Sequence, residues 1–165
     1  MKFIATKPAL VLGLVALAWA GVGQAQASSA SKYSCMSTGS MAPEPVGDRE
    51  GHLLAVNTGT CHAESGTFEG AIITQNTIWE VDKAAATMTS GNGVFRRPGG
   101  VGVYQLTSGT RSLVVQDGKV VGWTTSGKGL YTMAAGNMST VAGKTFSFTA
   151  KGTGFGRYSM ESSLD

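Results

Sequence analysis

Alternation of apolar and polar residues marks several short stretches in the second half of the chain. Phe146 and Phe148 alternate with Thr145 and Ser147, which is the period of two that a strand with one buried face requires. The longest stretch rich in strand-forming residues is 68–82. Because no segment shows the three-and-four spacing of an amphipathic helix, the pattern predicts an all-β fold.

A tripeptide repeat gives these stretches a regular spacing. Thr-Ser-Gly begins at Thr89, Thr107 and Thr125, so each copy starts eighteen residues after the one before. A period of this length is about twice that of a strand with its turn, which indicates successive antiparallel hairpins. The second copy is accordingly predicted to turn the chain at 108–110.

Turn signals separate the predicted strands. Pro98-Gly99-Gly100 is one, and Asp117-Gly118 favours a type I′ hairpin turn, which needs a positive φ at both central residues. About eight or nine strands follow from this pattern. Joined by short turns, they predict an antiparallel meander closed into a roughly eight-stranded barrel, since closure removes exposed sheet edges. A β-sandwich of two sheets is the alternative fold.

The first 27 residues have the pattern of a secretory signal peptide. Lys2 and Lys7 precede the uncharged apolar run 9–23, and small residues follow at 25–27. We therefore expect cleavage after Ala27 and a secreted or periplasmic protein. The apolar run is shorter than the roughly 20 residues of a spanning helix, so we expect no stable membrane insertion.

Composition divides the rest of the chain. Residues 28–50 are rich in Ser, Pro and Gly and are expected to form a polar N-terminal arm with one short edge strand near 32–37, while 51–165 form the barrel domain. Loss of Lys2 and Lys7 with the signal peptide would leave 11 of the 13 basic residues against 10 acidic ones. This nearly neutral chain, without a basic run, argues against nucleic acid as a partner.

The chain contains two cysteines, Cys35 and Cys61. In an oxidising compartment they are expected to form a disulfide bond. His62 follows Cys61 directly, which raises the alternative of a metal site. The chain lacks the Cys-x-x-Cys and His-x-x-x-His spacings of such sites, so no metal and no cofactor are predicted.

Several stretches resemble one family of barrels. They are the Thr-Ser-Gly-rich strands and the segments 102–104, 128–131 and 143–148. Over roughly residues 66–164 the chain resembles the allene oxide cyclases and plant dirigent proteins. The resemblance implies an antiparallel barrel that holds a small apolar or phenolic molecule, and in some members directs cyclisation or radical coupling without a cofactor. It leaves a homodimer or homotrimer open and assigns no catalytic residue here.

Aromatic and ionisable residues within the predicted strands form the candidate site. The predicted ligand-binding residues each carry a large ring: Trp79, Tyr104, Trp123 and Tyr131. The candidate catalytic residues are Glu69, Glu80, Arg96 and Tyr104. A carboxyl group buried in an apolar barrel could act as an acid or base, and an Arg or Tyr opposite it could hold an enolate or carboxylate. Because Trp79 and Glu80 are adjacent, only one of them can point inward in a regular strand.

Three functions remain open at this stage. The first is an exported protein that binds a small apolar or aromatic molecule, and the second is a cofactor-independent isomerase, cyclase or lyase acting inside the barrel. The third is a structural surface protein. A carboxylate that points into the barrel and pairs with Arg or Tyr would favour the enzyme. An apolar cavity would favour the binding protein, and a barrel filled by its own side chains would favour the structural protein. No hydrolase, zinc-protease or phosphate-loop motif is present.

Overall fold

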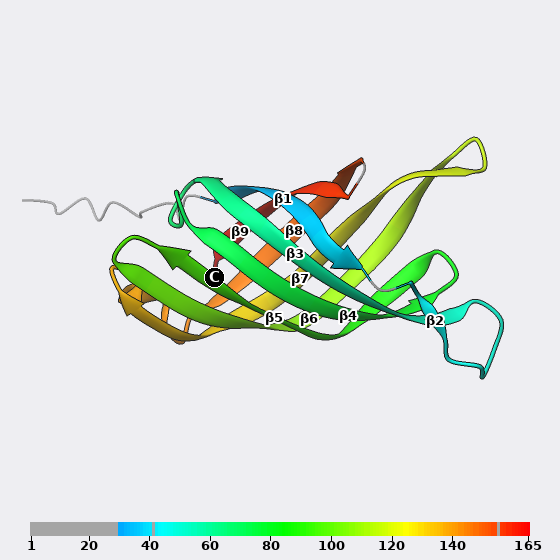
Figure 1. Cartoon of the computed structure of the whole chain (residues 1–165), viewed down its shortest axis with the longest axis horizontal. Coiled ribbons are helices and arrows are strands. Elements are labelled where there is room, and N and C mark those ends of the chain that lie inside the picture. The colour runs from blue at the N-terminus through cyan, green and yellow to red at the C-terminus, as the bar shows by residue number, and fades with distance from the viewer. Residues whose placement is uncertain (1–29, 41, 155) are drawn as a thin grey trace, which may run out of the picture.

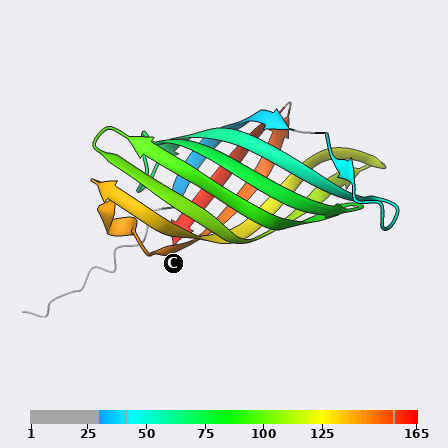
Figure 2. The same cartoon turned by 60° about the horizontal axis from the view of Figure 1, so that its bottom comes forward.

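A computed structural model describes residues 30–40, 42–154 and 156–165, which form one antiparallel β-barrel (Figure 1). The strands are β1 (Ser31–Ser40), β2 (Glu44–Pro45), β3 (His52–Ser65), β4 (Ile72–Asp82), β5 (Ala85–Arg97), β6 (Gly100–Gln116), β7 (Lys119–Gly136), β8 (Thr145–Gly154) and β9 (Arg157–Leu164). A 3-10 helix, η1, spans Ser139–Val141. The strands run obliquely around the barrel (Figure 2). The predicted all-β meander closed into an eight-stranded barrel is confirmed, with β2 as one extra strand.

Strand β1 closes the barrel. It pairs antiparallel with β3 on one side and with β9 on the other. Composition had assigned this segment to a loose polar arm with one short edge strand, so the barrel begins earlier than expected. The reason is a strict alternation in which Ser31, Tyr33 and Cys35 are buried while Lys32 and Ser34 are exposed. Only two of the three inward residues are apolar, so the pattern is faint in the sequence.

The predicted signal peptide, residues 1–27, lies outside the described residues. Within the part of the chain that the structure describes, no helix is long and apolar enough to cross a membrane.

Two of the turns predicted from the sequence are present in the structure, and a third is absent. Asp117 and Gly118 have φ values of 50° and 73°, as the predicted hairpin turn requires. Pro98 and Gly99 also form a turn. The prediction of a turn at 108–110 is wrong, because β6 continues without interruption through these residues. Glycine at position 109 removes a side chain from the barrel interior and does not reverse the chain.

Two copies of the repeat mark irregularities in the strands. Thr89 in β5 and Thr107 in β6 have no partner in the register of the neighbouring strand, so each is the extra residue of a β-bulge. A bulge reverses the alternation of inward and outward side chains. Tyr104 therefore points inward before the bulge in β6, and Arg111 points inward after it.

Inward glycines lie directly against aromatic rings on neighbouring strands. A Cβ atom on Gly102 would lie 2.1 Å from Cζ of Phe95, and one on Gly129 would lie 2.3 Å from Cζ of Phe146. These distances are far below van der Waals contact, so a larger residue could not occupy either position without displacing the ring. Aromatic residues and glycines thus lie side by side on the inner face, because the interior of an eight-stranded barrel has room for a ring only where its neighbour lacks a side chain.

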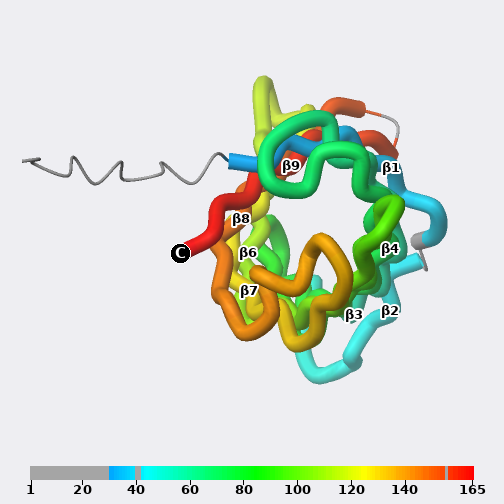
Figure 3. Tube along the Cα trace, turned by 90° about the vertical axis from the view of Figure 1, so that its left-hand side faces the viewer, coloured from blue at the N-terminus to red at the C-terminus, as the bar shows by residue number. Residues whose placement is uncertain are grey.

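Aromatic side chains fill one end of the barrel. Phe68, from the β3–β4 connection, packs against Phe95 and Tyr131 with ring centroids 5.2 and 5.3 Å away, and Phe146 lies 4.6 Å from Tyr131. Buried Met138, next to η1, joins the same core. Figure 3 looks onto this end, where the β3–β4 connection and the segment around η1 lie at the rim of the barrel. We call the four rings of Phe68, Phe95, Tyr131 and Phe146 the aromatic cluster.

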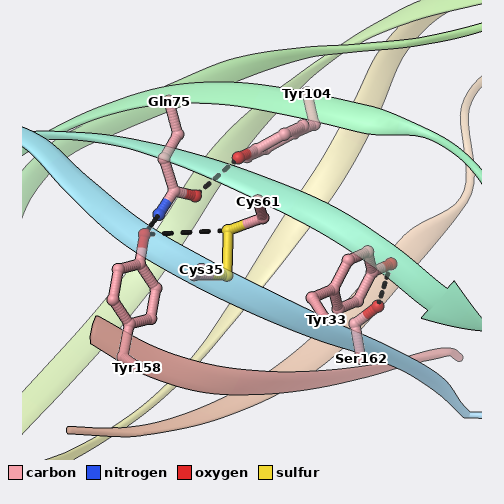
Figure 4. The surroundings of a disulfide bond; sticks show 7 residues. All are labelled: Tyr33, Cys35, Cys61, Gln75, Tyr104, Tyr158 and Ser162. Atoms are coloured by element: carbon pink, nitrogen blue, oxygen red, sulfur yellow. Dashed lines mark hydrogen bonds between the residues drawn. A yellow bond between two sulfur atoms is a disulfide. The ribbon is translucent and has the colours of Figure 1, made fainter. Parts of the chain in front are cut away.

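The predicted disulfide bond is confirmed (Figure 4). Cys35 and Cys61 are directly opposite each other in β1 and β3, with their Cα atoms 4.0 Å apart. On the other side of β1, the Tyr33 hydroxyl lies 3.0 Å from Oγ of Ser162 in β9. Strand β1 is therefore joined to β3 by a disulfide bond and to β9 by a side-chain hydrogen bond. The disulfide bond indicates an oxidising environment outside the cytoplasm.

The opposite end of the barrel continues into a projecting hairpin (Figure 1). Beyond Ser112 in β6 and Thr124 in β7, the two strands pair only with each other. Val115 and Val120 near its tip are 55% and 61% exposed.

We expect Gly102→Ala to destabilise the protein by about 1–3 kcal/mol, because the new methyl group overlaps Phe95. The matched control is Gly122→Ala, whose added Cβ meets nothing closer than 3.9 Å and should change the free energy of unfolding by less than about 0.5 kcal/mol. Denaturant unfolding measures both. Adding Phe95→Leu to Gly102→Ala should recover part of the loss, and equal losses from the two glycine substitutions would contradict the packing argument.

Reduction of the disulfide should lower the free energy of unfolding by about 3.5 kcal/mol, as expected for two cysteines 26 residues apart. The measurement is chemical denaturation of oxidised and reduced protein, with mass analysis after thiol labelling to count free cysteines. Cys35→Ser combined with Cys61→Ser should match the reduced protein. Unchanged stability after complete reduction would show that the bond does not restrain the unfolded chain.

Candidate functional site

A cavity of about 130 Å³ lies inside the barrel. It begins beside the aromatic cluster and extends toward the end that carries the β6–β7 hairpin, and all eight barrel strands contribute to its wall. A cavity of about 150 Å³ lined by apolar side chains is able to hold benzene. The interior therefore has room for one small ring that its own side chains leave unoccupied.

The four predicted ligand-binding residues all line this cavity: Trp79, Tyr104, Trp123 and Tyr131. Trp79 is only 2% exposed, and Trp123 is half-buried near the hairpin end. The structure thus brings together residues from β4, β6 and β7 that are far apart in the sequence. Their role in binding stays a prediction.

Three of the four candidate catalytic residues lie elsewhere. Glu69 is exposed in the β3–β4 connection, and Arg96 is exposed on β5. Glu80 faces away from the cavity, as expected once its neighbour Trp79 points inward, and its Oε1 lies 2.8 Å from Nε2 of His52. Of this set, only Tyr104 lines the cavity. Among the described lining residues, none carries a carboxylate.

A chain of hydrogen bonds crosses the cavity wall, and Figure 4 shows its members. The Tyr104 hydroxyl donates to Oε1 of Gln75 over 2.8 Å, and Nε2 of Gln75 donates to the Tyr158 hydroxyl over 2.7 Å. Burial raises the pKa of both tyrosines, although the Gln75 hydrogen bond and the charge of Arg111 partly oppose this for the pKa of Tyr158. Both phenols are therefore neutral hydrogen-bonding groups at physiological pH.

Arg111 lies between two tryptophans in the half of the cavity nearer the hairpin. Its guanidinium carbon is 4.2 Å from the ring centroid of Trp79 and 4.5 Å from that of Trp123. Its Nε donates to Oγ1 of Thr125, its register partner in β7, over 3.1 Å. Burial lowers the pKa of Arg111, but an arginine side chain remains protonated at neutral pH. Cation–π contacts therefore hold a charged group inside the barrel.

The sequence did not single out Arg111, Gln75 or Tyr158. Arg111 begins an apolar stretch, and the bulge at Thr107 shifts it to the inward face, so alternation counted from Tyr104 places it outside. Gln75 is polar and half-buried, which no local pattern distinguishes from a surface glutamine. Alternation alone could have found Tyr158, which shares the inward face with Met160 and Ser162.

Comparison with known proteins yields no match: no protein-family model, no curated protein and no solved structure is significantly similar to this chain. The eight-stranded antiparallel barrel that the resemblance to allene oxide cyclases and dirigent proteins implied is present, but no family match confirms membership of that family.

A second group of ionisable residues lies outside the cavity, where the segment before β3 meets β4. His52 is buried, with Nδ1 hydrogen-bonded to Asp48 and Nε2 to Glu80, while Arg49 binds Asp82 over 2.9 Å. The hydrogen bond with Asp48 is the largest cause that raises the pKa of His52, and it lowers the pKa of Asp48. This group fastens the segment before β3 to the barrel.

His52 should make stability depend on pH. Because its pKa is raised in the folded state, its contribution is complete below its unfolded pKa of about 6.5 and is lost as the pH rises through the folded value. The free energy lost in His52→Asn should therefore shrink between about pH 6 and pH 9, a range in which Asp48 stays ionised.

Denaturant unfolding of both proteins across this range gives the measurement. His62→Asn, at an exposed histidine outside the group, is the control for the substitution itself. A difference between His52→Asn and the natural protein that stays constant across this pH range would refute the assigned pKa direction.

Proposed function

We propose that the barrel binds one small, mostly apolar or aromatic molecule in its interior. The observation that supports this is the cavity of about 130 Å³ among aromatic side chains. Protein interiors are close-packed, and voids larger than a water molecule are few. The rest of this interior is filled tightly, ring against glycine, so the remaining space is a local exception that suits a ligand.

The composition of the wall supports an aromatic ligand. Trp79, Tyr104 and Trp123 offer ring faces and edges, while Gln75 and Tyr158 offer a small number of polar groups. Ligand sites commonly combine a mostly apolar wall with a few polar groups that fix orientation. A purely structural barrel would need no such space.

An enzymatic role, as the resemblance to allene oxide cyclases implies, is the second candidate. It would depend on Tyr104, Tyr158 and Arg111, because Glu69 and Glu80 are not among the described residues that line the cavity. We also propose that the protein acts outside the cytoplasm. The signal-peptide pattern and the disulfide between Cys35 and Cys61 support this location.

Neutral single-ring compounds should bind saturably to the protein. Toluene and benzyl alcohol are suitable probes, and the fluorescence of Trp79 and Trp123 should report their entry because both rings line the cavity. Ala150→Leu, which fills part of the cavity, should weaken binding strongly. Ala135→Leu, on the exposed part of β7, is the matched control and should leave binding unchanged.

Circular dichroism of each variant confirms that the barrel is folded. If neither probe changes the fluorescence or the thermal unfolding temperature of the natural protein, the interior is not a site for neutral small rings. Equal effects of the two alanine substitutions would place the binding elsewhere.

A further inference from the structure

Arg111 is the one charged residue among the described residues that line the cavity. No carboxylate of the described chain forms an ion pair with it. Arg111 is only partly buried, but a charge that is removed even in part from water without an opposite charge is costly, and proteins usually compensate it with a partner. The rings of Trp79 and Trp123 compensate part of this cost, but they supply no counter-charge.

The hydrogen-bonding capacity of Arg111 is also largely unused. Its Nε–H donates to Thr125, and no acceptor among the described residues takes a hydrogen bond from Nη1 or Nη2. A guanidinium group has five N–H donors in one plane, and contact with ring faces leaves them free to bind. Four donors on a group that lines the cavity therefore lack a partner among the described residues.

The arginine is also held in place before any ligand arrives. Trp79 and Trp123 lie on either side of it, and Thr125 fixes Nε. A side chain that is already immobilised loses little entropy when it binds. Planar N–H donors at a fixed position match the two oxygen atoms of a carboxylate.

We propose, on the basis of the proposed function, that the ligand of this barrel carries a carboxylate and that Arg111 binds it through Nη1 and Nη2. The apolar part of the ligand occupies the rest of the cavity, which Leu106 and the aromatic cluster help to line. The cavity volume of about 130 Å³ limits this part to about one ring, so the ligand class is a small aromatic or similarly compact carboxylic acid. A cationic ligand is disfavoured, because the guanidinium already occupies the space between the two tryptophans.

The test compares benzoate with two neutral probes of similar size, benzamide and benzyl alcohol. Binding is measured by tryptophan fluorescence and calorimetry at neutral pH, with the natural protein and with Arg111→Gln. The natural protein should bind benzoate at least tenfold more tightly than benzamide, and Arg111→Gln should weaken benzoate binding roughly ten- to hundredfold. The affinity for benzyl alcohol should differ only slightly between the natural protein and Arg111→Gln, because benzyl alcohol carries no charge.

Two further variants keep the result interpretable. Arg96→Gln removes an exposed arginine from the outer face of β5 and should behave like the natural protein. Arg111→Lys retains the charge without the planar donors, so it should bind benzoate with intermediate affinity. It also provides a folded comparison if Arg111→Gln does not fold.

The outcomes separate the two proposals. If neutral probes bind but benzoate binds no more tightly, the carboxylate inference is wrong and the proposed binding function stands. If no probe binds, the proposed function fails and this inference fails with it. Tighter binding of benzyltrimethylammonium than of benzoate would show that the tryptophans serve a cation, and would overturn the assignment of Arg111.

Discussion

The close approach of glycine backbone to aromatic rings determines what the inside of this barrel can contain. Phe95 lies against Gly102 and Phe146 against Gly129, at positions where any Cβ atom would overlap a ring. These pairs pack the aromatic end of the interior tightly. Toward the hairpin end, Trp79, Arg111 and Trp123 lie close together, and the cavity is lined by side chains of both regions.

The bulges in β5 and β6 connect this packing to the charge in the cavity. Thr89 and Thr107 each add one residue to a strand and reverse which side chains face inward. Without the second bulge, Arg111 would point to solvent and the cavity would be uncharged. In its first two copies the tripeptide therefore marks the place where the inward face changes and not a turn, and a candidate carboxylate site depends on the second copy.

Much of the fold was predictable because it rests on local patterns. The turn at Asp117 and Gly118 follows from backbone preferences, and the alternation around Phe146 and Phe148 reports their burial directly. Long-range register was not predictable. The role of β1 depends on partners in β3 and β9, and the inward position of Arg111 depends on a bulge. The four aromatic residues singled out from the sequence line the cavity, and their role in binding stays a prediction, whereas the polar groups between them emerged only from the structure.

The position of β1 between β3 and β9 also constrains the order in which the chain can fold. Tyr33 and Ser162, which meet across the β1–β9 seam, are 129 residues apart, so the ring of strands cannot close until nearly the whole chain has been synthesised. Cys35 and Cys61 are only 26 residues apart and can be joined long before that. The disulfide would then hold β1 against β3 while the later strands add in sequence. Closure of the last seam thereby becomes the addition of β9 to an edge that already exists.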